Sequence, residues 1–256
     1  MEFEGKRAIV TGASRGIGLA VVEVLIEGGA SVIAGARSAS PRIDELVAGG
    51  ALTFVAADLG TPGGPDALAA AADGQIDVLV NNVGGAPTRL DGFLAITDLD
   101  WLRTIELNFL AAVRTTRAIV PRMLEHGGSI VNVVSVNAEK PDPTVLDYSA
   151  AKGALANFTK GISAEFGSRG IRANAVNPGP VATDLWLGTG GIADLVSNAN
   201  GASPESVADS AVADSATRRF STPRDVAELV AFLASDRAGN ITGAGFRIDG
   251  GLISTM

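Results

Sequence analysis

The stretch Arg7-Ala8-Ile9-Val10-Thr11-Gly12-Ala13-Ser14-Arg15-Gly16-Ile17-Gly18 decides the fold of this 256-residue chain. It opens with a short apolar run typical of a buried β-strand, passes through three closely spaced glycines, and leads into the helical pattern of Leu19 to Glu27. Glycines at such a turn let a ligand approach the main chain, and the helix N-terminus directs free amides at a phosphate. An ordinary strand-to-helix turn hardly needs three glycines so placed, so the stretch predicts an α/β fold with a dinucleotide cradle.

Further short apolar runs predict the other strands of a parallel sheet, because strands buried on both faces are apolar along their length. They are Ser31–Ala36, Leu52–Ala57, Ile76–Val80, Ile130–Val134 and Gly170–Val176. Helical patterns lie between them, at Pro65–Ala72, at Leu99–Glu125, around Tyr148–Leu155 and at Val226–Ala234. Pro121 should kink or break the second of these helices, and Thr222-Pro223 should cap the last.

Composition limits the class of protein. With 46% hydrophobic residues the chain can bury one sizeable core, which predicts a single domain over residues 1–256. The absence of cysteine excludes disulfides and thiolate metal sites, and we expect no metal. A formal net charge of −8 argues against nucleic-acid binding. No apolar run approaches the roughly 20 residues that span a bilayer, and Met1–Lys6 lack a signal-peptide core, so we expect a soluble cytoplasmic protein without membrane contact.

Three residues predict acid/base chemistry. Tyr148 and Lys152 are four residues apart, so both side chains can share one face of a helix. A phenol titrates near ~10, and a neighbouring lysine cation should lower its pKa. Ser135, at the carboxyl end of the Ile130–Val134 strand, can donate a hydroxyl to an oxygen shared with the phenol. A lone Tyr-x-x-x-Lys also arises by chance on solvated surfaces, so the motif decides little alone.

Taken together, the motifs resemble those of the short-chain dehydrogenase/reductase family: Thr-Gly-x-x-x-Gly-x-Gly at residues 11–18, Asn-Asn-Val-Gly at 81–84, then Ser135 and Tyr148-x-x-x-Lys152. The resemblance covers Gly5 to Gly251, where Gly245–Gly251 is similar to the family's closing strand at a subunit interface. It implies one Rossmann domain with a doubly wound, seven-stranded parallel sheet. It also implies hydride transfer between a nicotinamide and a ketone or secondary alcohol.

The resemblance assigns roles to four catalytic residues. Tyr148 is the general acid/base, Lys152 lowers its pKa and binds the nicotinamide ribose, and Ser135 orients the substrate oxygen. The carbonyl of Asn108 anchors a water that completes a proton relay; the alternative for this residue is a capping or core-edge amide. His126, the single histidine, precedes Gly127-Gly128 and is better explained as a helix C-cap than as a catalytic group.

The same resemblance implies the cofactor contacts. The glycine loop and the helix that follows would hold the pyrophosphate, Asp58 and the next amide would meet the adenine, and the segment after the sixth strand would grip the carboxamide. Asp58 could equally be a turn cap, and Val83 replaces the family's alanine. Besides Tyr148 and Lys152, the implied residues are Gly12, Ser14, Arg15, Gly16, Ile17, Gly18, Asp58, Leu59, Asn81, Gly84, Pro178, Gly179, Val181 and Thr183.

The end of the second strand predicts a preference for NADP(H) over NAD(H). NAD-binding relatives carry an acid there, which accepts hydrogen bonds from the ribose, whereas this chain has Ala36 and Arg37. Arg15 and Arg37 could together bind a 2′-phosphate. The alternative is that Arg37 is a solvated loop cation.

The substrate is predicted less sharply. Asp184 to Arg219 is rich in small and polar residues, and we expect residues 184–222 to form a mobile substrate lid, a long loop over the site. A 3-oxoacyl-carrier-protein reductase needs a basic docking surface, but Thr183 to Thr217 contains no Lys or Arg. This favours a free ketone or alcohol, although Arg122, Arg169, Arg218 and Arg219 could form a patch.

Two further predictions concern assembly and class. In this family the helices that hold Asn108 and Tyr148 pair with their copies. Here these helices carry Phe109, Val113, Leu155, Phe158 and Ile162, which predicts a homotetramer, or at least a dimer through these helices. A non-catalytic nucleotide sensor or scaffold on the same fold is the alternative from another class, but such a protein should have lost at least one of the four catalytic residues.

Overall fold

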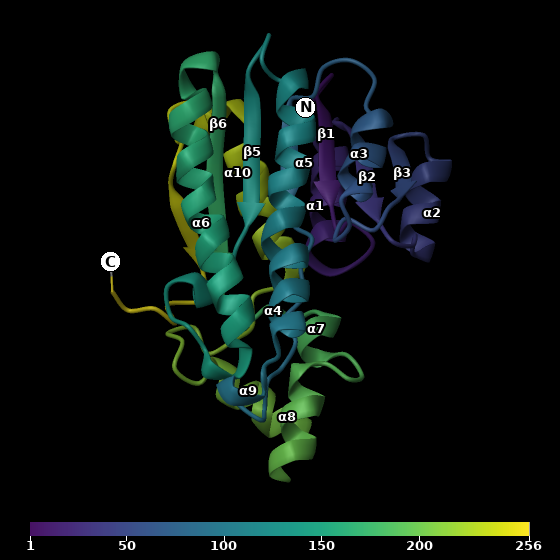
Figure 1. Cartoon of the computed structure of the whole chain (residues 1–256). Coiled ribbons are helices and arrows are strands. Elements are labelled where there is room, and N and C mark those ends of the chain that lie inside the picture. Colours follow the sequence, from purple (N-terminus) through teal and green to yellow (C-terminus); the bar gives the residue numbers. More distant parts are fainter. Residues whose placement is uncertain (256) are drawn as a thin grey trace.

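A seven-stranded parallel sheet forms the centre of the structure, a computed structural model that describes residues 1–255 (Figure 1). The strand order is β3-β2-β1-β4-β5-β6-β7, so the chain reverses its direction of travel between β1 and β4. The doubly wound Rossmann fold predicted from the sequence is confirmed. The strands are β1 Arg7–Thr11, β2 Ser31–Ala36, β3 Leu52–Ala56, β4 Val78–Asn81, β5 Gly128–Val133, β6 Ile171–Pro178 and β7 Gly245–Ile248.

Helices cover both faces of this sheet. α1 (Gly16–Glu27), α2 (Pro41–Ala48) and α10 (Pro223–Ala234) pack on one face, and α3 (Gly63–Ala70), α5 (Ala111–Ile119) and α6 (Leu146–Phe166) pack on the other (Figure 1). Successive strand residues serve opposite faces: Val10 packs with the first group, and Ile9 packs with the second. This explains why the central strands β1, β4 and β5 are mostly apolar. Thr222 caps α10 in a reciprocal box with Asp225, as its sequence predicts.

The helical pattern at Leu99–Glu125 is not one helix. α4 (Asp98–Ile105) is followed by a π-helical turn, Glu106–Leu110, before α5 begins. α5 ends at Ile119, and Pro121 lies in a 3₁₀ turn, which confirms the break predicted there. The π turn inserts a residue into the helical repeat, an irregularity that apolar periodicity does not reveal.

The segment at residues 184–222 contains three helices, so the expectation of a long loop was wrong. They are α7 (Asp184–Leu187), α8 (Ile192–Asn200) and α9 (Pro204–Val212). α9 begins at a Ser203 cap with Pro204 in its first turn, and α8 ends at Gly201, whose φ of 74° suits glycine. Small polar residues hid these signals. α8 and α9 lie beyond the end of the sheet (Figure 1). Within residues 1–255, no helix is long and apolar enough to span a membrane.

Candidate active site

The glycine loop after β1 is bound to the end of β4. Thr11 Oγ1 accepts the amides of Asn82 and Val83 at 2.9 and 3.1 Å, and Asn82 Nδ2 donates to the carbonyls of Thr11 and Gly12 at 3.0 and 3.1 Å. Gly12 has a φ of +66°, and a Cβ there would lie 2.9 Å from Val83 Cα. Glycine is therefore required at this position both for its backbone conformation and for space.

The other two glycines shape the same cradle. A Cβ on Gly18 would lie 2.2 Å from the Gly12 carbonyl oxygen, and Gly16, with a φ of +56°, faces Thr183 Cγ2 at 3.3 Å. α1 begins at Gly16, and the side chain of its N-cap residue, Arg15, does not bond to its amides. These uncapped amides and the missing Cβ atoms fit a pyrophosphate on the loop. The loop also meets the segment after β6, as the sequence motifs imply.

Ser135, Tyr148 and Lys152 come together at the carboxyl end of β5. Ser135 follows this strand, and its hydroxyl hydrogen-bonds with the Tyr148 phenol. Lys152 Nζ donates to the Val133 carbonyl at 2.8 Å and lies 5.7 Å from the centre of the Tyr148 ring. One turn of α6 thus places the phenol and the amine beside the carboxyl end of β5, next to Ser135, as the four-residue spacing predicts.

The pKa values of Tyr148 and Lys152 follow from burial. Burial raises the pKa of Tyr148, and the hydrogen bond from Ser135 only partly offsets this effect. Burial also lowers the pKa of Lys152 to about 8. The predicted lowering of the Tyr148 pKa by Lys152 is therefore wrong for the protein alone. Loss of water destabilises the phenolate and the ammonium alike, so the lysine is a weaker source of charge than the motif suggests.

Asn108 lies in the π-helical turn, and its side chain holds the chain after β4. Its Nδ2 donates to the carbonyls of Gly85 and Thr104 at 2.9 and 3.1 Å, and its Oδ1 accepts the Gly85 amide at 3.0 Å. A Cβ on Gly84 would lie 2.7 Å from Asn108 Oδ1 and 3.4 Å from Lys152 Nζ. The structure thus brings Asn108, Gly84 and Lys152 together. π turns are frequent at functional sites.

The side chain of Asn81 is not available to a cofactor. It is buried, and its Nδ2 donates to Thr116 Oγ1 and Asn132 Oδ1 at 3.0 and 2.8 Å. Asn132 in turn donates to Thr159 Oγ1 at 2.8 Å, so these polar groups join β4, β5, α5 and α6. A cofactor contact from Asn81 would therefore come from its main chain.

The remaining implied residues lie around the cradle. Asp58 Oδ1 accepts the Gly60 amide at 3.0 Å, which is the turn cap considered as its alternative, and the Leu59 side chain is part of the core. Arg15 and Arg37 are exposed, and neither has an ion-pair partner within residues 1–255. Thr183 Oγ1 lies 3.4 Å from the Val181 carbonyl at the start of α7.

The segment after β6 is closely packed. Pro178 and Val181 are buried, and a Cβ on Gly179 would lie 2.9 Å from Asp249 Cα. Val181 also bridges to Ser221, which joins the two ends of the α7–α9 segment. In the glycine loop, Ser14 and Ile17 are half-buried. His126 is exposed at the amino end of β5, at the opposite edge of the sheet from Ser135.

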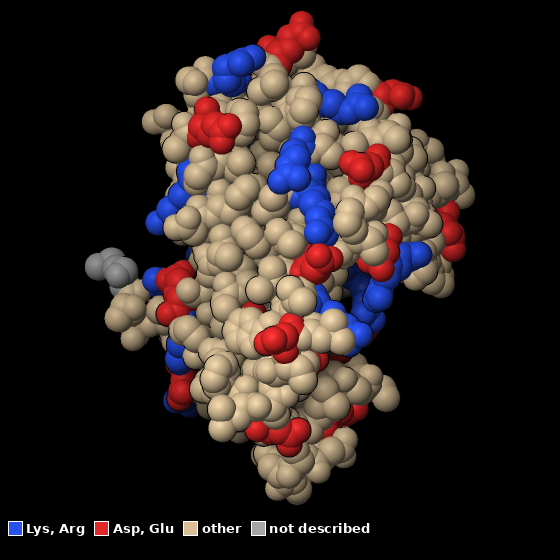
Figure 2. Space-filling view, viewed as in Figure 1, with Lys and Arg blue, Asp and Glu red and all other residues tan. Residues whose placement is uncertain are grey.

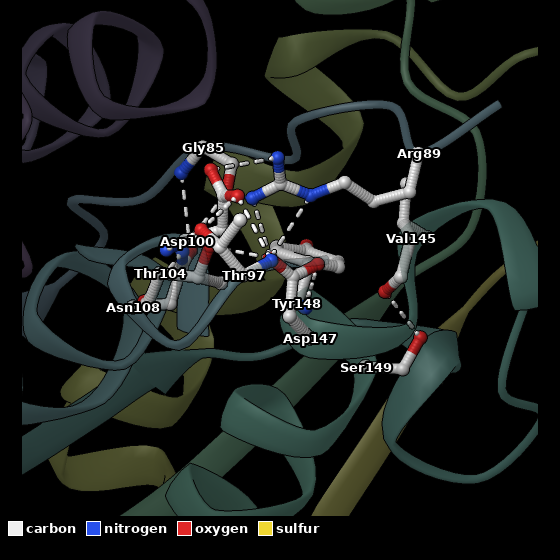
Figure 3. A network of polar contacts seen from close by, with 10 residues as sticks. All are labelled: Gly85, Arg89, Thr97, Asp100, Thr104, Asn108, Val145, Asp147, Tyr148 and Ser149. Carbon is white, nitrogen blue, oxygen red and sulfur yellow. Dashed lines mark hydrogen bonds and ion pairs between the residues drawn. The ribbon is translucent and has the colours of Figure 1, made fainter. Parts of the chain in front are cut away.

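Sequence reasoning missed two charged residues next to Tyr148. Arg89 and the fully buried Asp147 form an ion pair with a 2.7 Å contact (Figure 3). An acid in the first turn of a helix is common and has no special meaning, and Arg89 lies outside every motif. The one available signal was that Asp147 directly precedes the motif tyrosine.

Comparisons with known proteins agree with this geometry. A family model described as "Enoyl-(Acyl carrier protein) reductase" matches residues 12–253. The 3-oxoacyl-[acyl-carrier-protein] reductase FabG of Vibrio cholerae is 36% identical over 98% of this chain and 99% of its own. Acetoacetyl-CoA reductase of Cupriavidus necator is 33% identical over 96% and 97%. The crystal structure of L-sorbose reductase from Gluconobacter frateurii, complexed with NADPH and L-sorbose, gives a TM-score of 0.90 at 32% identity and covers 100% of both chains.

The seven-stranded Rossmann sheet and the site at its carboxyl edge define a nicotinamide-dependent oxidoreductase that acts on CH–OH or C=O groups. The chain belongs to the short-chain dehydrogenase/reductase family and is similar to 3-oxoacyl-carrier-protein reductases.

Proposed function

We propose that the protein transfers a hydride between NADP(H) and a free ketone or its secondary alcohol. The observation that carries this proposal is the meeting of Ser135, Tyr148 and Lys152 at the carboxyl end of β5, beside a glycine cradle. The cofactor supplies the hydride at C4 of its nicotinamide, and the protein aligns it and moves the proton.

In reduction, Tyr148 donates its proton to the carbonyl oxygen, and in oxidation the phenolate accepts it. Ser135 donates a hydrogen bond to the same oxygen and stabilises the charge that develops there. Lys152 binds the nicotinamide ribose. Asn108 fixes the main chain at Gly85, and the carbonyl of Asn108 anchors the water that links Lys152 to solvent.

The test is an NADPH absorbance assay with a panel of ketones, run beside NADP⁺ with the matching alcohols. Tyr148→Phe should lower kcat by at least about 10²-fold, because it removes the general acid/base, while cofactor binding stays nearly intact. A variant within a few-fold of wild type contradicts the assignment of Tyr148. A wild type that binds NADPH and turns over no compound favours the non-catalytic sensor instead.

The NADP(H) preference is supported by a missing acid and by two cations that have no ion-pair partner in the described chain. Arg15 and Arg37 can approach a 2′-phosphate, and buried Ala36 stands where an acid would repel it. Charge-assisted hydrogen bonds contribute about 1.5–3 kcal/mol each, so even one favours NADP(H) by at least roughly tenfold. Ala36→Asp combined with Arg37→Ala should reverse the ratio of kcat/KM for the two cofactors. Equal use of NADH and NADPH by wild type contradicts this role.

A free ketone is favoured over a carrier-protein substrate by the position of the cations. Arg122 and Arg169 bond to carbonyls of Gly74, Ala69 and Leu124 near the amino ends of β4–β6, far along the strands from Ser135, and Arg219 pairs with Asp225. The lid, residues 184–222, adds exposed Leu185, Leu187 and Leu195 instead. The named carrier-protein and CoA relatives make a thioester the second candidate. A panel that pairs free β-ketoesters with the same acyl groups on acyl carrier protein separates the two.

We also propose a homotetramer built through α5, α6 and the π turn between α4 and α5. α4 exposes Leu99 and Leu102, Phe109 packs edge-on against Phe158 at 6.0 Å, and the surface over α6 is mostly uncharged (Figure 2). Leu155 is buried in the core, so its assignment to the outward face was wrong. Light scattering that shows a monomer at micromolar concentration contradicts the proposal.

A further inference from the structure

Asp147 is a fully buried carboxylate whose oxygens are all bonded, and one of its partners is the peptide that carries the reacting phenol (Figure 3). Arg89 donates to Asp147 Oδ2 from Nη2 at 2.7 Å and from Nε at 3.1 Å. Thr104 Oγ1 donates to the same oxygen at 2.7 Å. Asp147 Oδ1 accepts the Tyr148 amide at 3.0 Å. A buried charge is tolerated only when it is paired and hydrogen-bonded in this way.

Arg89 joins three segments around this carboxylate. Its Nη1 donates to Asp100 Oδ1 in α4 at 3.2 Å, and its amide donates to the Thr144 carbonyl, just before α6, at 2.6 Å. Asn108 holds Gly85 in the same connection between β4 and α4. Arg89 and Asn108 also line one open groove of about 410 Å³, together with Gly85, Ala86, Pro87, Asp100, Arg103, Thr104 and Leu107. Arg89 therefore connects the wall of this groove to the first turn of α6, which carries Tyr148.

We propose that Arg89 and Asp147 are positioning residues, which lock the start of α6 to the chain after β4 and keep the net charge beside the Tyr148 phenol near zero. This inference rests on the proposed role of Tyr148. It assigns the pair no contact with the substrate.

The two charges act on the phenol with opposite sign. Asp147 alone opposes a phenolate, and Arg89 alone favours it, so each residue offsets the other. The Asp147 carboxylate raises the pKa of Arg89, which keeps the guanidinium charged. Other polar and charged groups near the phenol or the pair are present in both variants proposed below. They are Ser135 and Lys152 beside Tyr148, Asp100 bonded to Arg89, and Arg103 in the groove with Arg89.

The chain has a single tyrosine, so titration of that tyrosine reports on this site alone. The experiment labels tyrosine with ¹³C at Cζ and follows the resonance against pH by NMR in the whole protein without substrate. Asp147→Asn should move the titration to lower pH, and Arg89→Met should move it to higher pH. The double variant should return close to wild type, because the carboxamide that Asp147→Asn introduces can bond to both Thr104 and the Tyr148 amide.

Arg224→Met is the matched control, since it removes an arginine from an exposed ion pair with Glu27. It should leave the titration unchanged. Mere loosening of α6 would admit water and move both single variants to lower pH, because burial raises the pKa of the wild-type phenol. Shifts of the same sign, or curves that superimpose on wild type, overturn the proposal.

If Arg89→Met does not fold, Thr104→Val takes its place. It keeps both charges and removes one hydrogen bond to Asp147, so it should leave the titration unchanged while Asp147→Asn still lowers it. A Thr104→Val shift as large as that of Asp147→Asn overturns the proposal.

Turnover gives an independent readout. In the Arg89 and Asp147 variants, kcat should fall by about ten- to a hundredfold, because small misplacements of a reacting group have costs of this size. The dissociation constant for NADPH should stay within about twofold. The titration does not depend on turnover, so a wild type that reduces no ketone refutes the proposed function and leaves this test intact. Active variants with wild-type titrations refute the positioning pair alone.

Discussion

The two edges of the sheet both gather polar side chains, but they use them differently. At the amino edge a groove of about 190 Å³ is lined by polar residues that include Lys6, Asp77, His126, Arg172 and Asp236. Apart from His126, which lies 3.8 Å from Glu125, these groups bond to one another or to the main chain. Lys6 lies 3.9 Å from Asp77 and 3.8 Å from Asp236, and Arg172 donates to the carbonyls of Leu233 and Ser235 at 2.8 and 2.9 Å.

At the carboxyl edge Ser135 and Lys152 are buried and Tyr148 is partly buried, and these reactive groups have few partners. Lys152 has one hydrogen bond, to a carbonyl, and no carboxylate partner within residues 1–255. The paired charges there, Arg89 and Asp147, lie behind the tyrosine. The difference shows that a density of polar groups does not make a site. A site needs polar groups that are not already bonded to other protein groups and can therefore bind a ligand. In parallel sheets such groups lie at the carboxyl ends of the strands.

Stability should separate the two edges most strongly. Arg89→Met leaves Asp147 as an unpaired buried carboxylate and should lower the free energy of unfolding by about 3–5 kcal/mol. Lys6→Met removes a half-exposed cation at the amino edge and should cost about 0–1 kcal/mol. Urea denaturation of both variants measures the difference. Equal losses would mean that the Arg89 pair is no more desolvated than a surface pair.

The pH dependence of stability should carry the signature of Lys152. Burial lowers its pKa from 10.5 to about 8 in the folded protein, so between these values the unfolded chain binds more protons. The free energy of unfolding should therefore rise as the pH rises from about 8 to 10.5. Below pH 8 the buried amine is charged in the folded protein, and the full cost of its desolvation lowers the stability. The unfolding free energy of wild type relative to Lys152→Met should rise by about 3 kcal/mol over that window. A difference that stays flat with pH would show that the amine is solvated.

Two glycine substitutions should distinguish a ligand cradle from a structural turn. A Cβ on Gly18 would lie 2.2 Å from the Gly12 oxygen, and one on Gly127, at the amino edge, would lie 2.6 Å from the Gly170 oxygen. Gly18→Ala should distort the phosphate cradle and weaken NADPH binding by about tenfold or more, or roughly 1.4 kcal/mol. Gly127→Ala should lower the melting temperature without changing that affinity. Calorimetric titration with NADPH measures both affinities. If Gly18→Ala and Gly127→Ala bind NADPH equally well, the glycine loop does not hold the pyrophosphate.

Much of this architecture was predictable because the signals are local. Strands buried on both faces must be apolar, so the positions of β1 to β6 could be predicted to within a few residues, whereas β7 was expected only from the family resemblance. The glycine loop was predictable because a Cβ atom on Gly12, Gly16 or Gly18 would come too close to neighbouring atoms. The interruption by the π turn and the helices α7–α9 were not, because neither produces a strong apolar period.

The sequence by itself determined the sheet, the glycine cradle and the convergence of Ser135, Tyr148 and Lys152, because strand order and helical spacing place these groups at one edge. Only the tertiary structure decided their electrostatic state. Burial, which depends on what packs around α6, raises the Tyr148 pKa and lowers that of Lys152. The tertiary structure also directs the Asn81 side chain into the core. It pairs Arg89 with Asp147, which lies 58 residues away in the sequence. Such contacts join elements that no local pattern links, and the energy of a charge depends on whether water reaches it.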